Sequence, residues 1–160
     1  MICFTSGALL TVAYTAPAYA TGTWTWPVVG PLIRGFDPPD SPFGSGHRGV
    51  DIAAPVGTSV RAAAEGTVTF AGPVGGRLFL TIDHGAGLES TYSWVDSLAV
   101  RRGDVVTQGQ VIARSGAGHA GALVPHLHVG VRLFDVYVDP LTYLAPVEVW
   151  RFIRLAPLAA

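Results

Sequence analysis

Short apolar and polar stretches alternate along the chain from residue 47 to about residue 144. Runs rich in β-branched residues, such as TSVRAAAEGTVTFAG and GRLFLTIDHGAGLESTYSWV, are separated by Gly-containing turns at intervals of roughly ten residues. This spacing predicts an all-β domain, an antiparallel sheet or sandwich with little helix. Pro140 closes the pattern, because a proline cannot donate to a strand ladder.

Two segments of this region have the same outline. APVGTSVRAAAEGTVTFAG and RRGDVVTQGQVIARSG each predict a strand, a Gly turn and a second strand, which together form a hairpin. Similar hairpin pairs occur in biotin- and lipoyl-carrier domains, which need a lysine at the hairpin tip. All 10 basic residues of this chain are arginines, so a carrier function is excluded.

The chain divides into a domain and flanking regions. Residues 1–20 carry no charged side chain and end in the A-x-A pattern of Ala18 and Ala20, which is typical of a signal peptide. A membrane anchor that stays attached is the alternative, and both interpretations predict a domain outside the cytoplasm. The rest divides into a Pro/Gly-rich lead-in, the domain itself and a C-terminal extension that is either a strand or a short helix: residues 21–42, 43–144 and 145–160.

Composition narrows the classes of function. Apolar residues make up 49% of the chain and charged residues 13%, which suits a packed core and not a disordered chain. The net charge of −1 argues against nucleic-acid binding, which normally needs a basic patch. Cys3 is the single cysteine, so any metal must be held by His, Asp or Glu side chains.

His126 and His128 lie one residue apart in the apolar stretch PHLHVGV. Residues i and i+2 of a strand face the same side, so these two imidazoles are expected to point together. Leu127, Val129 and Val131 then form the opposite, buried face. A pair of this kind fits a metal site and a solvated strand face equally well.

The stretch GHRGVD places His47 four residues before Asp51. Gly46 and Gly49 disfavour a helix here, so a turn that leads into a strand is expected, and it can bring both side chains to one ion. A solvated loop histidine with a turn aspartate is the alternative. Together with one histidine of the His-x-His pair, they form the three-ligand set of a catalytic zinc site, which keeps a fourth position for water. The remaining histidine would lie beside that water, where it can take the water's proton or stabilise the oxyanion.

Four stretches together resemble the lysostaphin/LytM-type zinc metallopeptidases in order and spacing: GHRGVDIAAPVGTSVRAAAEGTVTFAG, IDHGAGLESTYSW, VRRGDVVTQGQVIARSGAG and PHLHVGV. The resemblance covers residues 43–144 and implies the duplicated hybrid motif fold. It further implies a secreted or cell-wall-associated bacterial endopeptidase that cuts the peptides of peptidoglycan with one Zn²⁺ per domain. We expect a monomer, with neither a nucleic-acid partner nor a membrane span after processing.

The resemblance also implies residue roles. Its metal ligands correspond to His47, Asp51 and His128, and its catalytic histidine corresponds to His126. The family usually has a second catalytic histidine in a Tyr-x-His-Leu pattern, whereas this chain has Trp94 there, in TYSWVDSL. Indole donates one N–H and has no basic nitrogen, so it cannot accept a proton.

Other side chains are candidates for the walls of the cleft. Tyr92 alternates with Trp94 along the predicted strand and is expected on the same side. His119 lies in the Gly-rich loop GAGHAGALVP just before the His-x-His strand, where it either reaches the metal or is a mobile loop histidine. Asp83 and His84, in IDHGAG, are expected in a hairpin turn.

Two other functions stay open beside the endopeptidase. Because Trp94 replaces a catalytic imidazole, the domain could be inactive and serve to bind the wall or to regulate other wall hydrolases. A phosphocarrier on a similar sheet, with a histidine that carries phosphate, is a cytoplasmic function, and the signal-like start of the chain argues against it.

Overall fold

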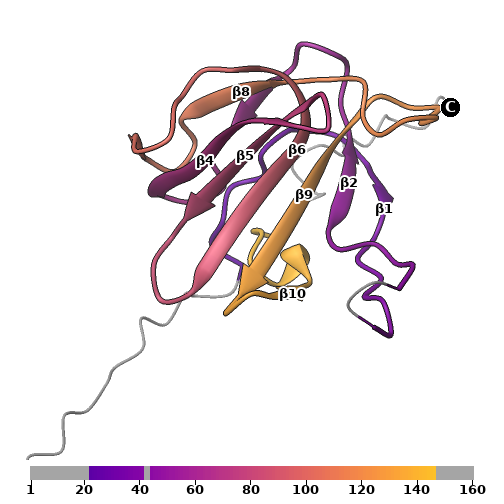
Figure 1. Ribbon diagram of the computed structural model, residues 1–160, viewed down its shortest axis with the longest axis horizontal. Coiled ribbons are helices and arrows are strands. Elements are labelled where there is room, and N and C mark those ends of the chain that lie inside the picture. Colours follow the sequence, from indigo (N-terminus) through magenta and orange to yellow (C-terminus); the bar gives the residue numbers. More distant parts are fainter. Residues whose placement is uncertain (1–21, 42–43, 147–160) are drawn as a thin grey trace, which may run out of the picture.

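The computed structural model of the chain describes residues 22–41 and 44–146 (Figure 1). The expected signal peptide and the C-terminal extension from residue 147 onward lie outside the described residues. In the part that is described, no helix is long and apolar enough to cross a membrane. The single helical element of that part is the 3-10 turn η1, Pro140–Thr142, after the last strand.

Strands dominate the structure and pair antiparallel, which confirms the predicted all-β fold. The main path through the sheet runs in the order β1-β2-β9-β6-β5-β4-β7, while β10 pairs with β9, and β8 pairs with β3 and β6. The strands are β1 Leu32–Arg34, β2 Val50–Ala53, β3 Ser59–Arg61, β4 Gly66–Val74, β5 Arg77–Asp83, β6 Leu88–Leu98, β7 Val105–Val106, β8 Val111–Ser115, β9 His126–Leu133 and β10 Val136–Val138.

The two similar segments pair with each other and not internally. Strand β3 pairs with β8 and strand β4 pairs with β7, so the prediction of two separate hairpins is wrong. Ala62 N–H donates to the carbonyl of Gln110 at 2.9 Å, and Ala62 accepts from Gly109 N–H at 2.8 Å. An equivalent exchange joins Val68 to residues 103–104. The duplicated motif is therefore held together by reciprocal bonds between its copies.

The core side of β9 follows the predicted alternation. Leu127, Val129 and Val131 have exposed fractions of 0–1%. Burial of a side chain of this size contributes about 1.5–3 kcal/mol relative to exposure. This apolar face fixes the register of β9, because a shift by one residue would bring the histidines into the core and these residues out of it.

The lead-in packs onto the domain. Trp24 is 3% exposed and forms a backbone bridge with Leu144, and Trp26 Nε1–H donates to the carbonyl of Ala145 at 2.7 Å. Strand β1 continues the sheet by pairing with β2, the strand that leads out of the GHRGVD motif (Figure 1). Both ends of the described chain are thus part of the same folded unit.

Candidate metal centre

The pairing of β2 with β9 assembles the centre of the site. Asp51 lies directly opposite His128, and Ala53 lies opposite His126. Directly opposed residues of an antiparallel pair project to the same face of the sheet. The register therefore gathers the carboxylate and both imidazoles of the His-x-His pair on one side, as the sequence predicts.

The turn before β2 adds the imidazole of His47. A backbone bridge joins His47 to Asp37 of the lead-in, with N···O distances of 2.6 and 3.0 Å. The Nδ1–H of His47 donates to the carbonyl of Gly35 at 2.7 Å. Because a carbonyl only accepts, Nδ1 carries a proton, and Nε2 is the ring nitrogen that points toward Asp51 and the site.

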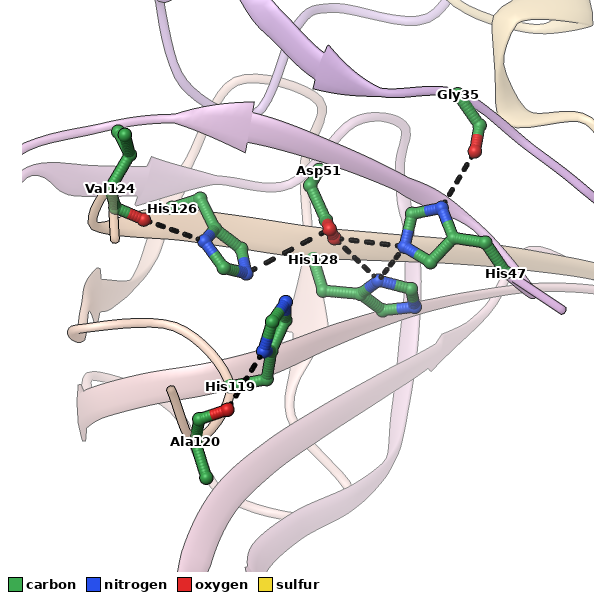
Figure 2. A network of polar contacts seen from close by, with 8 residues as sticks. All are labelled: Gly35, His47, Asp51, His119, Ala120, Val124, His126 and His128. Atoms are coloured by element: carbon green, nitrogen blue, oxygen red, sulfur yellow. Dashed lines mark hydrogen bonds and ion pairs between the residues drawn. The ribbon is translucent and has the colours of Figure 1, made fainter. Parts of the chain in front are cut away.

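Three atoms that can ligate a metal once they are deprotonated meet at one point, as Figure 2 shows. Asp51 Oδ1 lies 3.0 Å from His47 Nε2 and 2.8 Å from His128 Nδ1, and those two nitrogens are 3.0 Å apart. Ligand atoms of a tetrahedral zinc stand about 3.3 Å from one another, so a small outward shift would seat the ion. The donor set of two imidazole nitrogens and a carboxylate thus fits Zn²⁺.

Gly49 allows the first motif to lie this close to β9. A Cβ atom at this position would be 2.8 Å from Nε2 of His128 and 2.2 Å from the carbonyl oxygen of Val129. Any other residue would push the turn away from the His128 ring. The glycine inside GHRGVD is therefore a requirement of the site geometry.

Asp51 is buried, with an exposed fraction of 2%. Burial alone would raise the pKa of its carboxyl group, but the hydrogen bond from His128 and the positive charge that His47, His128 and His126 can carry outweigh burial and hold this pKa below its usual range. The carboxylate is thus kept ionised, which is the form that binds a metal.

His126 is also buried, at 1% exposed. Its Nδ1–H donates to the carbonyl of Val124 at 2.8 Å, while its Nε2 has no hydrogen-bond partner among the described residues and lies 3.9 Å from Asp51 Oδ2. A buried polar atom without a partner is costly, so its place beside the three donors indicates a functional constraint. The lone pair of Nε2 faces the same centre.

A cleft of about 320 Å³ opens over the site. Its walls come from the GHRGVD turn, β5, β6, the loop before β9, β9 and β10: Gly46, His47, Arg48, Phe79, Ser93, Trp94, His119, His128 and Tyr137. The cleft thus reaches two of the three donors, together with His119 and the indole of Trp94. His126 lies behind this surface.

Trp94 occupies a β-bulge in β6. Leu78 of β5 pairs with Val95, and the next residue, Phe79, pairs with Ser93, so Trp94 is the extra residue. Its φ angle is +65°, which is rare for a bulky side chain. Bulges re-aim side chains beside active sites, and here both Ser93 and Trp94 line the cleft although they are neighbours.

The bulge explains why the prediction for Tyr92 is wrong. Tyr92 is 0% exposed and points into the core, where its hydroxyl accepts from Ala63 N–H at 2.8 Å and lies 3.1 Å from Ser90 Oγ. Simple alternation would place it on the side of Trp94, but the extra residue interrupts the alternation. Ser93, which the sequence analysis did not select, lies at the cleft in place of Tyr92.

The contacts of His84 indicate a structural role. It follows β5 at the hairpin turn, as predicted, and its Nδ1–H donates to the carbonyl of Glu65 at 2.6 Å. Its Nε2 lies 2.8 Å from Ser90 Oγ, and its ring packs on Trp24 with centroids 4.6 Å apart. Burial lowers the pKa of His84, while the bond to Glu65 and the charges of Asp83 and Glu89 oppose this shift.

The sequence model of peptidase family M23 matches residues 45–140, which include every one of the clustered side chains. The chain belongs to peptidase family M23. This membership confirms the resemblance to the lysostaphin/LytM-type enzymes. Among solved structures, this M23 chain is similar to lysostaphin from Staphylococcus simulans, with 28% identity, a TM-score of 0.66 and coverage of 78% of this chain and 55% of that one. A zinc-containing peptidase from Vibrio cholerae gives 29% identity, a TM-score of 0.65 and coverage of 78% and 41%.

Relatives among curated proteins match most of the M23 chain. An uncharacterized protein of Mycobacterium tuberculosis is 37% identical over 153 residues, which cover 91% of this chain and 59% of the relative. The murein hydrolase activator NlpD of Salmonella dublin is 30% identical over 155 residues, covering 87% of this chain and 40% of the relative. The chain thus spans about half the length of these relatives.

Proposed function

We propose that this M23 chain is a zinc-dependent endopeptidase that hydrolyses peptide bonds of bacterial peptidoglycan outside the cytoplasm. The observation that carries the proposal is the meeting of His47 Nε2, Asp51 Oδ1 and His128 Nδ1 within 3.0 Å of one another beside an open cleft. These three side chains would hold the ion. A zinc ion with three protein ligands supplies Lewis-acid activation of water and of a substrate carbonyl.

Hydrolysis of a peptide bond adds one water molecule. The carbonyl carbon gains the water oxygen, the C–N bond breaks, and the leaving nitrogen takes one proton, while the second proton leaves with the ionisation of the new carboxyl group. His126 is placed to take a proton from the attacking water, because its Nε2 carries a lone pair beside Asp51 and is not engaged by another described residue.

The surroundings support these roles. The bond from His47 to the carbonyl of Gly35 fixes the ring of a metal ligand, and the bond from His126 to the carbonyl of Val124 fixes the tautomer of the acid/base group. Similarity to a zinc-containing peptidase and to lysostaphin supports both the metal and the reaction. The signal-like first 20 residues and the lipoprotein relatives, among them a lipoprotein of Escherichia coli, support an extracytoplasmic location.

The direct test is incubation of the full chain, loaded with zinc, with purified peptidoglycan, followed by mass spectrometry of the soluble fraction. We expect released peptides with new amino and carboxyl termini, and no release by the chain treated with a chelator. Release that is unchanged by the chelator would contradict a metal-dependent reaction. Intact peptidoglycan that retains bound protein would contradict hydrolysis altogether.

A second function is favoured by one specific observation. Trp94 removes a basic nitrogen from the cleft wall, and a relative of this chain is a murein hydrolase activator. A domain that binds the wall or activates another hydrolase would leave purified peptidoglycan intact when it acts alone. When a wall amidase is added, such a domain would increase the amount of fragments that the amidase releases. The complete donor set of His47, Asp51 and His128 favours the peptidase, because an inactive domain has no use for converging buried donors.

A further inference from the structure

The loop between β8 and β9, residues 116–125, contributes the imidazole of His119 to the wall of the cleft. His119 is partly exposed and is a wall of the cleft together with His47 and His128. Its ring stands against that of His126, with centroids 4.8 Å apart and an interplanar angle of 62°. The site therefore holds two imidazoles besides its metal ligands, although β6 contributes none.

The ring of His119 points toward the site. Figure 2 shows its ring extending from the loop toward His126 and Asp51, with the other nitrogen turned back to the carbonyl of Ala120. That contact, from Nδ1–H to the oxygen of Ala120, measures 3.2 Å, and Nε2 lies on the other side of the ring, toward the site. Ligand-type atoms of His119, His126 and Asp51 all lie within 4.8 Å of one another.

The loop is built to lie against this centre. Gly118 has a φ angle of +87°, and a Cβ atom there would be 2.4 Å from Cε1 of His126, so only glycine lets the loop cover that ring. Gly116 N–H donates to the carbonyl of Trp94 at 3.1 Å. The backbone at the bulge therefore anchors the loop that presents His119.

We infer that His119 is the second imidazole of the site, and that it supplies from the loop the basic nitrogen that Trp94 lacks. This inference rests on the proposed function. His126 is buried at 1% exposed, whereas His119 reaches the cleft where a substrate would lie. During hydrolysis His126 takes the proton of the attacking water, and His119 gives a proton to the leaving nitrogen as the C–N bond breaks. Transfer of the water-derived proton from His126 to His119 then restores both groups.

The test compares His119→Ala with Leu123→Ala, a matched control in the same loop whose side chain is 99% exposed. We expect one zinc per chain in both variants. We expect His119→Ala to lower kcat on peptidoglycan peptides by about 10²–10⁴-fold with little change in KM, the range for loss of one acid/base group. Leu123→Ala is expected to stay within about twofold of the wild type in both constants.

Two further measurements test the role of His119 separately from the peptidase activity of the chain. Acetohydroxamate should bind the zinc-loaded His119→Ala chain about tenfold or more weakly than the wild type, because a hydrogen bond to a charged ligand is lost. The double variant His119→Ala with Trp94→His should recover part of the lost kcat, because it returns an imidazole to the same cleft. A wild-type chain that binds zinc and cleaves nothing would contradict the proposed function, and acetohydroxamate binding would still report the place of His119.

Three outcomes would overturn the inference. Loss of zinc from His119→Ala would make this residue a ligand. Equal kcat values in His119→Ala and Leu123→Ala would make it an ordinary loop histidine. Unchanged acetohydroxamate binding in His119→Ala would place the imidazole away from the bound anion.

Discussion

Asp51 and His128 are direct partners across the β2–β9 pair, and Oδ1 of the aspartate lies 2.8 Å from Nδ1 of the histidine. The register of the two strands therefore positions two of the three proposed metal ligands. This register is itself fixed by the buried apolar residues of β9, among them Leu127 at 0% exposed. The geometry of the centre thus depends on core packing as much as on the ligands.

Replacement of His128 by alanine should remove zinc from the chain. The two remaining ligands, His47 and Asp51, are too few for a tight zinc site, so we expect affinity to fall by more than the roughly 10–100-fold that loss of a supporting group costs. Metal analysis after gel filtration measures this. His84→Gln removes an imidazole outside the cleft and should retain one zinc per chain. Full zinc in His128→Ala would contradict the ligand assignment.

Replacement of His126 by alanine should leave the zinc in place and abolish measurable hydrolysis. The imidazole is buried and its Nε2 has no described hydrogen-bond partner, so its removal affects proton transfer, with an expected loss of about 10²–10⁴-fold in kcat. The carbonyl of Val124 loses its donor, which costs about 1–3 kcal/mol of folding free energy. Parallel measurements are metal content, urea unfolding and peptide release. Release of zinc by this variant would show that the division between ligand and base is wrong.

Replacement of Trp94 by histidine distinguishes the proposed peptidase function from the regulatory function. Histidine tolerates a φ angle of +65° better than tryptophan does, while the contact with Phe79, whose ring centroid is 5.4 Å away, is weakened. We expect stability to change by no more than about 1 kcal/mol. If His119 already serves as second imidazole, kcat should rise by at most about 10-fold, below the 10²–10⁴-fold of a first acid/base group. Hydrolysis that appears only in this variant would favour the regulator.

Stability should depend on pH through His84. Burial lowers its pKa below the ordinary value of 6.5, so the unfolded chain binds the proton more readily than the folded one. The free energy of unfolding is therefore expected to be highest above pH 6.5 and to fall as pH decreases from 6.5 through the lowered pKa. Urea unfolding of the metal-free chain at several pH values measures this.

The variant His84→Gln serves as control for this pH dependence. It should lose about 1 kcal/mol at neutral pH, because the bonds to Glu65 and Ser90 are replaced imperfectly, and its stability should fall less steeply below pH 6.5. All other ionisable groups are common to the two proteins, so their contributions cancel in the difference. Parallel pH curves for the two proteins would contradict the assignment to His84.

Much of the architecture was predictable from local patterns. Alternation along β9 identified the face of Leu127 and the common side of His126 and His128, because both follow from the two-residue period of a strand. The His-x3-Asp spacing indicated the other half of the centre only in combination with the His-x-His pair and the family resemblance. The partners of the similar segments were not predictable, since alternation shows that a strand exists and not which strand it joins.

The remaining differences come from backbone irregularity. The bulge at Trp94 has no local sequence signal, because a positive φ angle is expected at glycine and not at a bulky indole. Tyr92 and Ser93 pair regularly with Val129 and His128, so Tyr92 faces the core and Ser93 the cleft, and the bulge turns Trp94 to the cleft side as well. The direction of the His119 side chain depends on contacts of its loop with Trp94 in β6 and with the ring of His126 in β9. Local sequence patterns do not predict such contacts between different elements.

The carbonyl of Gly35 affects where the boundaries of an expressed fragment can be placed. It orients the ring of His47, yet it precedes the M23 match, which begins at residue 45. The tryptophans at positions 24 and 26 likewise fasten the start of the lead-in to residues 144 and 145, beyond the end of that match at residue 140. An expression fragment trimmed to the family match would therefore keep all three proposed ligands and lose the carbonyl of Gly35, which orients one of them.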